Sequence, residues 1–141
     1  MTDLTIIPHE VDEISTDDHL DSRYIQERID YLEYIIANNP DEMADKVVEE
    51  WQEEIVKLDE LKEQYVNDYG ESSWEFGAQF HRVDDFENYA RELADDIGAI
   101  SDEVANGWPT RHIDWAAAAD DLANDYSEVT FDGVDYYTQE A

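Results

Sequence analysis

The stretch DWAAAADDLANDYSEVTFDGVDYY, residues 114–137, decides the fold class of this chain. Its first half is rich in alanine and begins with an aspartate, a pattern typical of a capped helix. In its second half, segments 129–131 and 134–136, each with apolar residues at alternate positions, flank Asp132-Gly133, a strong signal for a tight turn between two antiparallel strands. A helix beside a β-hairpin predicts an α+β protein. The stretch contains no Lys or Arg, so its carboxylates have no basic neighbours along the chain.

Acidity is the unusual property of the whole sequence. Its 141 residues include 39 Asp and Glu but only 8 Lys and Arg, which gives a formal net charge of −31. The hydrophobic share of 42% and the aromatic share of 12% are enough to bury a core, so a disordered acidic tail is excluded. Because self-repulsion on this scale destabilises a compact state, we expect either a saline environment or a cationic partner to offset it.

Upstream of the opening stretch, apolar residues at helical spacing predict helices over residues 22–37, 41–69 and 85–97. Asp41 is placed to cap the second of these helices, and Gly70 follows its last turn. The short connection between the first two helices favours an antiparallel hairpin. The apolar seam of the second helix would also suit a coiled-coil dimer, so a homodimer stays open as an alternative.

These segments divide the chain into three expected parts. Residues 1–21 are expected to form a flexible acidic arm, or a strand that pairs elsewhere. Residues 22–69 form the helical hairpin, and residues 72–141 form a small acidic module with two helices and the C-terminal β-hairpin. Segment 74–82 is expected to be a short strand or a loop, and segment 101–109 a loop. The predicted fold class is therefore α+β and mostly helical.

An internal similarity links two of the predicted helices. Residues 82–96 (RVDDFENYARELADD) and 111–125 (RHIDWAAAADDLAND) align without a gap. Either an ancient duplication or convergence of two Asp-capped amphipathic helices explains the similarity. Both copies end in carboxylates, which oppose the helix dipole by about 0.3–1 kcal/mol each. Because sequences depart from local stability mainly at functional sites, these acidic ends are candidate sites.

No motif in the chain indicates enzymatic chemistry. The four His lack the spacing of a catalytic zinc site, and there is no Cys, no Gly-rich phosphate loop and no Gly-x-Ser-x-Gly elbow. The Asp-rich segments do not match the ligand spacing of a calcium loop. We therefore expect no catalytic residues, no cofactor and no specific metal site.

The sequence also lacks the features of exported or membrane proteins. The first 18 residues carry neither a basic region nor a long apolar run, and no apolar stretch reaches membrane-spanning length. An anionic membrane surface would repel so acidic a chain. The expected location is the cytoplasm of a bacterial host cell.

The charge of the chain resembles that of DNA in amount and spacing. Duplex DNA carries one negative charge per about 1.7 Å, so a charge of −31 corresponds to roughly 53 Å of duplex, or about 15 base pairs. Carboxylates four residues apart on a helix are about 6 Å apart, close to the step between phosphates. A folded protein of this kind would engage the Lys and Arg of a DNA-binding cleft without contacting nucleic acid itself.

A longer pattern in the C-terminal half runs Ile-Asp-aromatic, small residues, Asp-Leu and Asn-Asp-Tyr before a short strand. It falls on Ile113, Asp114, Trp115, Ala119, Asp121, Leu122, Asn124, Asp125 and Tyr126. With the segment before it, this pattern makes residues 72–137 resemble the ArdA-like antirestriction proteins of phages and plasmids. The resemblance implies an elongated, acidic mimic of DNA that occupies a restriction enzyme. The hairpin of residues 22–69 departs from the family pattern, which leaves the target enzyme open.

Two sets of carboxylates are the candidate partner-binding residues. The first set comprises Asp95, Asp96, Asp102, Glu103, Asp120, Asp121, Asp125 and Asp132. The second set, on the helical hairpin, ranks lower because Lys57 and Lys62 interrupt it, and comprises Glu49, Glu50, Glu53, Glu54, Asp59, Glu60 and Glu63. Trp115 and Leu122 are expected to be core residues.

The predicted function is stoichiometric inhibition of a nucleic-acid-binding defence enzyme, of the restriction-modification or CRISPR type. The expected partner is thus a basic DNA-binding protein or a nucleoprotein complex. Two other interpretations stay open: a halophile-adapted domain, and an acidic structural or adaptor protein. Binding to a DNA-processing enzyme that DNA competes away at ordinary salt would support mimicry alone.

Overall fold

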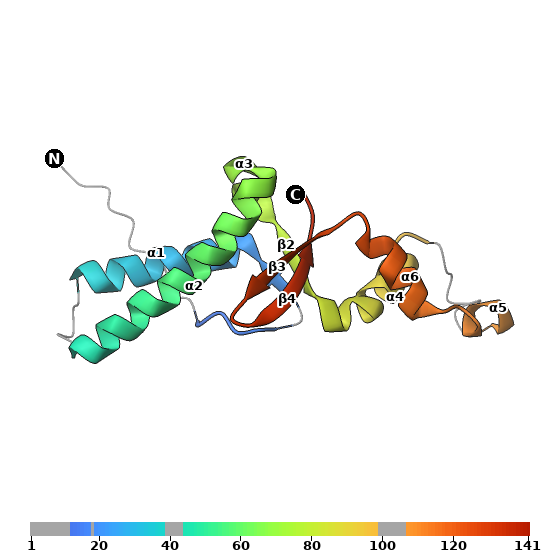
Figure 1. The fold of residues 1–141 in the computed structure, drawn as a ribbon, viewed down its shortest axis with the longest axis horizontal. Helices are drawn as coiled ribbons and strands as arrows, with labels where there is room; N and C mark the ends of the chain where they lie inside the picture. The colour runs from blue at the N-terminus through green and yellow to red at the C-terminus, as the bar shows by residue number, and fades with distance from the viewer. Residues whose placement is uncertain (1–11, 18, 39–43, 99–106) are drawn as a thin grey trace.

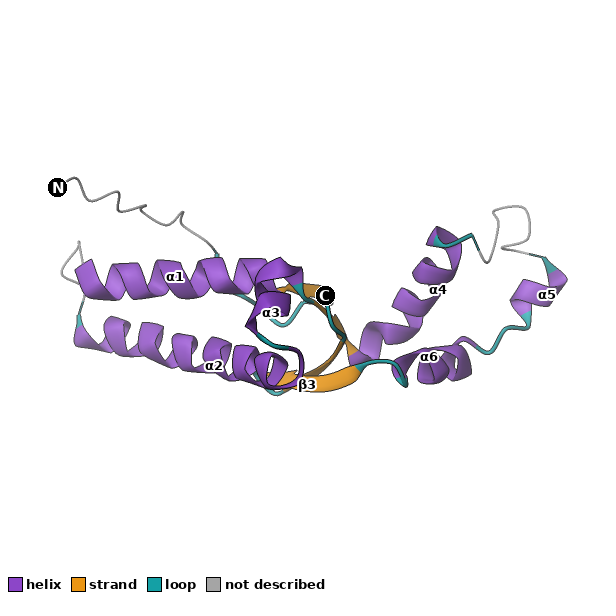
Figure 2. Ribbon diagram, turned by 90° about the horizontal axis from the view of Figure 1, so that it is seen from above, coloured by secondary structure: helices purple, strands orange, loops and turns teal. Residues whose placement is uncertain are grey.

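The computed structural model describes residues 12–17, 19–38, 44–98 and 107–141. Figures 1 and 2 show an elongated molecule with a helical hairpin at one end, an antiparallel sheet in the middle and a group of shorter helices at the other end. The predicted fold class, α+β and mostly helical, is confirmed. Among the described residues, no helix is long and apolar enough to cross a membrane.

The sheet joins strands from distant parts of the chain. It contains β1 (His19–Asp21), β2 (Gln79–Arg82), β3 (Ser127–Phe131) and β4 (Val134–Thr138) in the order β1-β2-β4-β3, with all neighbours antiparallel. The end of the expected acidic arm is therefore a strand that pairs elsewhere. β2 fills the centre of the sheet because it pairs with β1 on one side and β4 on the other.

The opening stretch folds as predicted. Helix α6 (Trp115–Ala123) is capped by Asp114, whose Oδ1 accepts a hydrogen bond from the backbone N–H of Ala117 at 3.0 Å. The turn between β3 and β4 has positive φ at both central residues, 50° at Asp132 and 79° at Gly133. These angles match a tight hairpin turn whose twist suits antiparallel strands, which explains the preference for Asp-Gly there.

The main core lies between the helical hairpin and the sheet. Helices α1 (Ser22–Asn38) and α2 (Asp45–Tyr69) pack together and cover one face of the sheet. The fully or almost fully buried side chains of this core are Ile25, Ile29, Leu32, Leu58, Leu61, Tyr65, Trp74, Ala78, Phe80, Val129, Phe131 and Tyr136. The apolar stripes predicted for the two helices are used within the molecule, so this hairpin is intramolecular.

A second, smaller core holds the C-terminal helices to the sheet. Helix α4 (Phe86–Asp96) contacts α6, and Phe86, Ala90 and Ala119 are its buried residues. Leu122 packs against this cluster, as expected for a core residue. Trp115 is only half-buried and lies under the guanidinium of Arg91, 5.4 Å from the ring centre, so it is a rim residue and not a core residue.

Several local expectations differ from the structure or fall outside it. Residues 74–77, the start of the segment expected to be a strand or a loop, belong instead to a short helix, α3 (Glu71–Gly77), because the buried Trp74 anchors it to the main core. A single 3-10 turn (Val83–Asp85) precedes α4, and helix α5 (Trp108–Arg111) begins inside the expected loop. Asp41, the predicted cap, lies outside the described residues, and α2 begins after Ala44.

The contacts also group the elements differently from the expected division of the chain. The sequence predicts that the C-terminal β-hairpin belongs to the acidic module, yet β3 packs directly on α2 and its Val129 and Phe131 belong to the main core. Among the described residues, α4 and α6 form a second cluster, against which Tyr137 of β4 packs. The apolar face of a two-stranded hairpin must be buried against another layer, and here α1 and α2 form that layer.

Candidate partner-binding surface

The basic residues are largely used inside the molecule. Five of the eight Lys and Arg form ion pairs: Arg23–Asp21 at 2.7 Å, Arg28–Glu54 at 2.6 Å, Lys57–Asp132 at 3.0 Å, Lys62–Glu71 at 3.4 Å and Arg82–Asp84 at 2.7 Å. A sixth, Arg91, lies over Trp115. Because cations are so few, most carboxylates of the described residues are exposed and have no ion pair.

The first candidate set is spread over the C-terminal helices. Asp95 and Asp96 end α4, which runs away from the sheet, whereas α6 runs back toward it and is followed by Asp125 just before β3. Asp120 and Asp121 lie within α6, and all five of these side chains are exposed. The structure thus places them on two packed helices, although at different distances from the sheet.

The other three members of that set do not join this group. Asp132 lies in the β3–β4 turn, where its Oδ1 accepts a hydrogen bond from Nζ of Lys57 on α2 at 3.0 Å. Its charge is therefore partly compensated, and it sits beside the helical hairpin. Asp102 and Glu103 lie outside the described residues.

The second set forms a longer and straighter row than its sequence suggested. Helix α2 has 25 residues, so it is about 38 Å long. Its outer side, opposite the buried Leu58, Leu61 and Tyr65, carries exposed carboxylates at Glu49, Glu53, Asp59, Glu60 and Glu63. Glu50 is also exposed and borders a depression beside the β3–β4 turn.

Glu54 is the exception in this second set. Both of its carboxylate oxygens accept hydrogen bonds from Arg28 of α1, from Nε at 2.6 Å and from Nη2 at 2.9 Å. The side chains retain only 12% and 17% of their exposure. Glu54 therefore joins the two helices and is not displayed to a partner. Because residues four apart lie on the same side of a helix, Glu54 is next to the buried Leu58. This spacing was the available sign in the sequence that Glu54 lies at the edge of the core.

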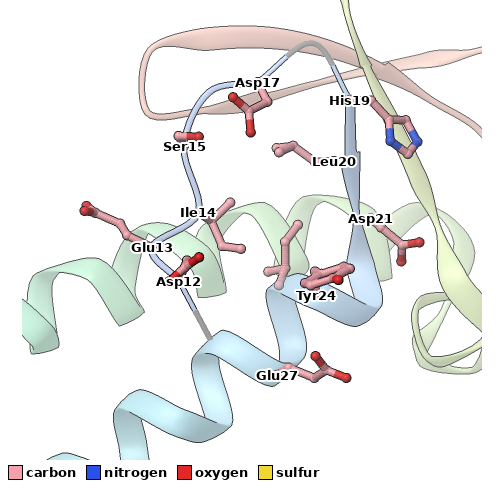
Figure 3. A pocket seen from close by; sticks show the side chains of 11 residues that line it. Asp12, Glu13, Ile14, Ser15, Asp17, His19, Leu20, Asp21, Tyr24 and Glu27 are labelled. Carbon is pink, nitrogen blue, oxygen red and sulfur yellow. The ribbon is translucent and has the colours of Figure 1, made fainter. Parts of the chain in front are cut away.

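A groove at the start of α1 escaped the sequence analysis. The segment 12–17 runs alongside β1 near the first turns of α1, and a groove of about 630 Å³ lies between them (Figure 3). Ile14, Leu20 and Tyr24 line it, together with Asp12 and Asp17. The isolated Ile14 and Leu20 in an otherwise polar segment were the available signal that this segment packs against the fold.

Among the groups with shifted pKa values, Asp21, His81 and Tyr126 lie in or beside the sheet, and each shift has a structural cause. Hydrogen bonds from Arg23 lower the pKa of Asp21 to about 2, against a partial desolvation that raises it. Burial, aided by the neighbouring His19, lowers the pKa of His81 to about 4. Burial and the hydroxyl of Tyr89 raise the pKa of Tyr126. These groups lie in the sheet or at its junction with α4 and α6, where they serve packing and pairing.

The described part of the chain holds no cluster of three metal-ligating side chains that could bind an ion. A comparison with protein families, with curated proteins and with solved structures finds no match to this chain. Functional inference therefore rests on the arrangement of charge and shape.

Proposed function

We propose that this protein is a DNA mimic that inhibits a nucleic-acid-binding defence enzyme of a bacterial host cell, of the restriction-modification or CRISPR type. It acts stoichiometrically by occupying the DNA-binding cleft and performs no catalysis of its own. The partner is a basic protein or nucleoprotein complex, and the inhibitor itself contacts neither nucleic acid nor membrane.

The observation that carries the proposal is the pairing of the basic residues within the molecule. Arg28 is held by Glu54, and Lys57 and Lys62 pair with carboxylates from other elements. The outer side of α2 and the helices α4 and α6 are left with carboxylates at helical spacing. Because these carboxylates are mounted on helices, their spacing is set before binding, and little ordering entropy is lost when a cationic cleft closes on them.

The elongated shape gives the same charge the form of a duplex segment. Helix α2 alone presents a row from Glu49 to Glu63 that is about 21 Å long, and α4 and α6 extend the acidic surface on the far side of the sheet. Lys and Arg side chains that normally bind phosphates would meet carboxylates at a similar pitch. Release of condensed counterions would then favour binding, as it does for DNA.

The test is a binding competition at ordinary salt. Immobilised restriction and CRISPR nucleases are exposed to the protein in 0.15 M NaCl, and a duplex of about 15 base pairs is added as competitor, a length taken from the charge density of DNA. We expect at least one nuclease to bind the protein, to lose it to the duplex, and to bind it more weakly as salt rises.

Other outcomes identify the alternatives. Tight binding that the duplex does not disturb would contradict mimicry and indicate an acidic adaptor. A chain that unfolds in 0.15 M NaCl and regains its circular dichroism only near molar salt would indicate a halophilic domain instead. A nuclease inactivated by a catalytic substitution serves as the control. It should bind the protein and the duplex as the active nuclease does, because occupation of the cleft requires no turnover.

A further inference from the structure

The groove framed by residues 12–17, β1 and the start of α1 combines an apolar interior with an acidic rim. Ile14 and Leu20 extend toward each other from its two sides (Figure 3). Tyr24 stands at its mouth with 63% of its surface exposed. The Tyr24 ring is not needed to join α1 to the main core, because Ile25 and Ile29 occupy the inner face of the helix.

The rim keeps a negative charge that the molecule does not neutralise. Asp12 and Asp17 are exposed beside the apolar residues, and Glu27 follows Tyr24 on the same side of α1. None of the ion pairs found among the described residues engages these three carboxylates.

Two cations near the groove are engaged by other groups. Arg82 pairs with Asp84 at 2.7 Å and donates from Nη1 to the backbone oxygen of Thr16 at 2.8 Å. Arg23 donates from Nε and Nη2 to the carboxylate of Asp21, at 3.1 and 2.7 Å. Asp21 also lines the groove, and Arg23 compensates its charge. The groove is thus an apolar and aromatic hollow, and its carboxylates at Asp12, Asp17 and Glu27 have no ion pair among the described residues. Such a hollow is complementary to a ligand with an aliphatic stem and a positively charged end.

We propose that this groove binds an arginine side chain of the target enzyme, an inference that rests on the proposed function and names what enters this part of the mimic. The aliphatic stem would pack between Ile14 and Leu20. The guanidinium would lie against the Tyr24 ring and donate to the rim carboxylates. Lysine fits less well, because its compact ammonium is strongly hydrated and does not stack on a ring.

The experiment titrates the full-length, ¹⁵N-labelled protein with the peptide acetyl-Leu-Arg-Leu-amide and follows amide shifts by NMR. We expect saturable shifts confined to residues 12–27. The same peptide with citrulline, which is isosteric but uncharged, should give no saturation. Tyr24→Ala should raise the Kd about fivefold, the size of an exposed cation–π contact, and Asp17→Asn with Glu27→Gln should raise it further.

Matched controls separate the groove from bulk charge. Phe76→Ala removes another exposed aromatic, 77% exposed on α3, and Glu60→Gln with Glu63→Gln removes two exposed carboxylates from α2. Neither should change the Kd. The substituted side chains are all exposed, so the variants keep the fold, which circular dichroism checks.

Several results would overturn this inference. Shifts spread along the acidic row of α2, equal binding of the citrulline peptide, or an equal affinity for acetyl-Leu-Lys-Leu-amide would each do so. The two proposals fail separately: a nuclease that still releases the Tyr24→Ala protein to duplex DNA with unchanged affinity leaves the mimicry intact and removes only the groove. If the duplex does not compete with the protein for the nuclease but the arginine peptide still binds normally, the mimicry is contradicted and the groove remains.

Discussion

Arg28 of α1 grips Glu54 of α2 through two hydrogen bonds, at 2.6 and 2.9 Å, in a position where both side chains are largely buried. The glutamate raises the pKa of the arginine further above its ordinary value. Although the chain has a net charge of −31, this pair makes one carboxylate unavailable to a partner. It removes that carboxylate from the surface and holds the two long helices together.

Removal of one partner of this pair should destabilise the protein. Arg28→Met leaves a desolvated carboxylate unpaired, and we expect a loss of about 2–3 kcal/mol in the free energy of unfolding, below the value for a fully buried pair. The double variant Arg28→Met with Glu54→Met should be more stable than Arg28→Met alone, since no buried charge is left behind.

Urea denaturation followed by circular dichroism measures these changes. The exposed pair of Lys57 and Asp132 provides the control, and Asp132→Asn should leave the urea midpoint unchanged. A single Arg28 variant as stable as the parent protein would show that the pair does not hold the hairpin together.

Asp114 should act through helix capping and not through a specific chemical role. Asp114→Ala removes the acceptor for the N–H of Ala117 and should cost about 1 kcal/mol of stability. Asp114→Asn keeps a good capping side chain and should be nearly neutral in thermal unfolding. Both variants should still inhibit the target, because a mimic spreads its binding over many carboxylates. Complete loss of inhibition by a folded Asp114→Asn protein would point to a catalytic or metal site.

Acid should weaken the junction between the sheet and α4 through His81. Its ring stacks on Tyr89, with 3.8 Å between ring centres, and lies opposite His19 and Tyr137 in the sheet. The pKa of His81 is about 4 in the folded protein against 6.5 ordinarily, so the unfolded chain binds more protons between these pH values. The free energy of unfolding should therefore fall as pH drops from about 6.5 to 4.

The contribution of His81 is read as a difference between proteins. After allowance for partial exposure of the ring, it amounts to about 1–2 kcal/mol. A His81→Gln protein should lose this part of the pH dependence, whereas the exposed His112→Gln protein should keep the parent profile. Identical pH profiles for all three proteins would refute the role assigned to His81.

Salt should stabilise the isolated protein. Added NaCl screens the repulsion among its carboxylates, so the thermal midpoint should rise between about 0.01 and 0.15 M as the Debye length falls from about 30 to 8 Å. The same scan on the Arg28→Met protein should show at least as steep a rise. A midpoint that falls with salt would contradict strong self-repulsion.

Two sets of five carboxylates should differ in their effect on target binding. One variant neutralises Asp95, Asp96, Asp120, Asp121 and Asp125, and the matched variant neutralises Glu49, Glu53, Asp59, Glu60 and Glu63. We expect the first to cost more affinity, because Lys57 and Lys62 lower the net negative charge of α2 beside the second set even when paired, whereas α6 carries no Lys or Arg. Each variant should flatten the dependence of log Kd on log salt.

Competition against duplex DNA on the same nuclease measures both losses, after circular dichroism has shown that each variant is folded. Equal losses would mean that only total charge matters. A larger loss from the second set would move the principal contact surface to the helical hairpin.

Local patterns in the sequence were sufficient for the elements whose causes are local. The Asp114 cap, the Asp132-Gly133 turn and the apolar stripes of α1 and α2 each depend on residues within a few positions of one another. A side chain that satisfies a nearby N–H, or a backbone angle that favours glycine, acts in any tertiary context. The same holds for the total charge, which is a sum over residues.

Tertiary structure alone decided which of these elements meet. Pairing of β1 with β2 joins residues 60 positions apart, and the closure of such a contact depends on the whole core, not on any short pattern. The packing of β3 on α2, the withdrawal of Glu54 into its pair with Arg28, and the groove beside Tyr24 follow from that assembly. The sequence by itself determined how much negative charge the protein carries and on which helices, whereas the fold decided which carboxylates face outward, because exposure depends on neighbours that are distant along the chain.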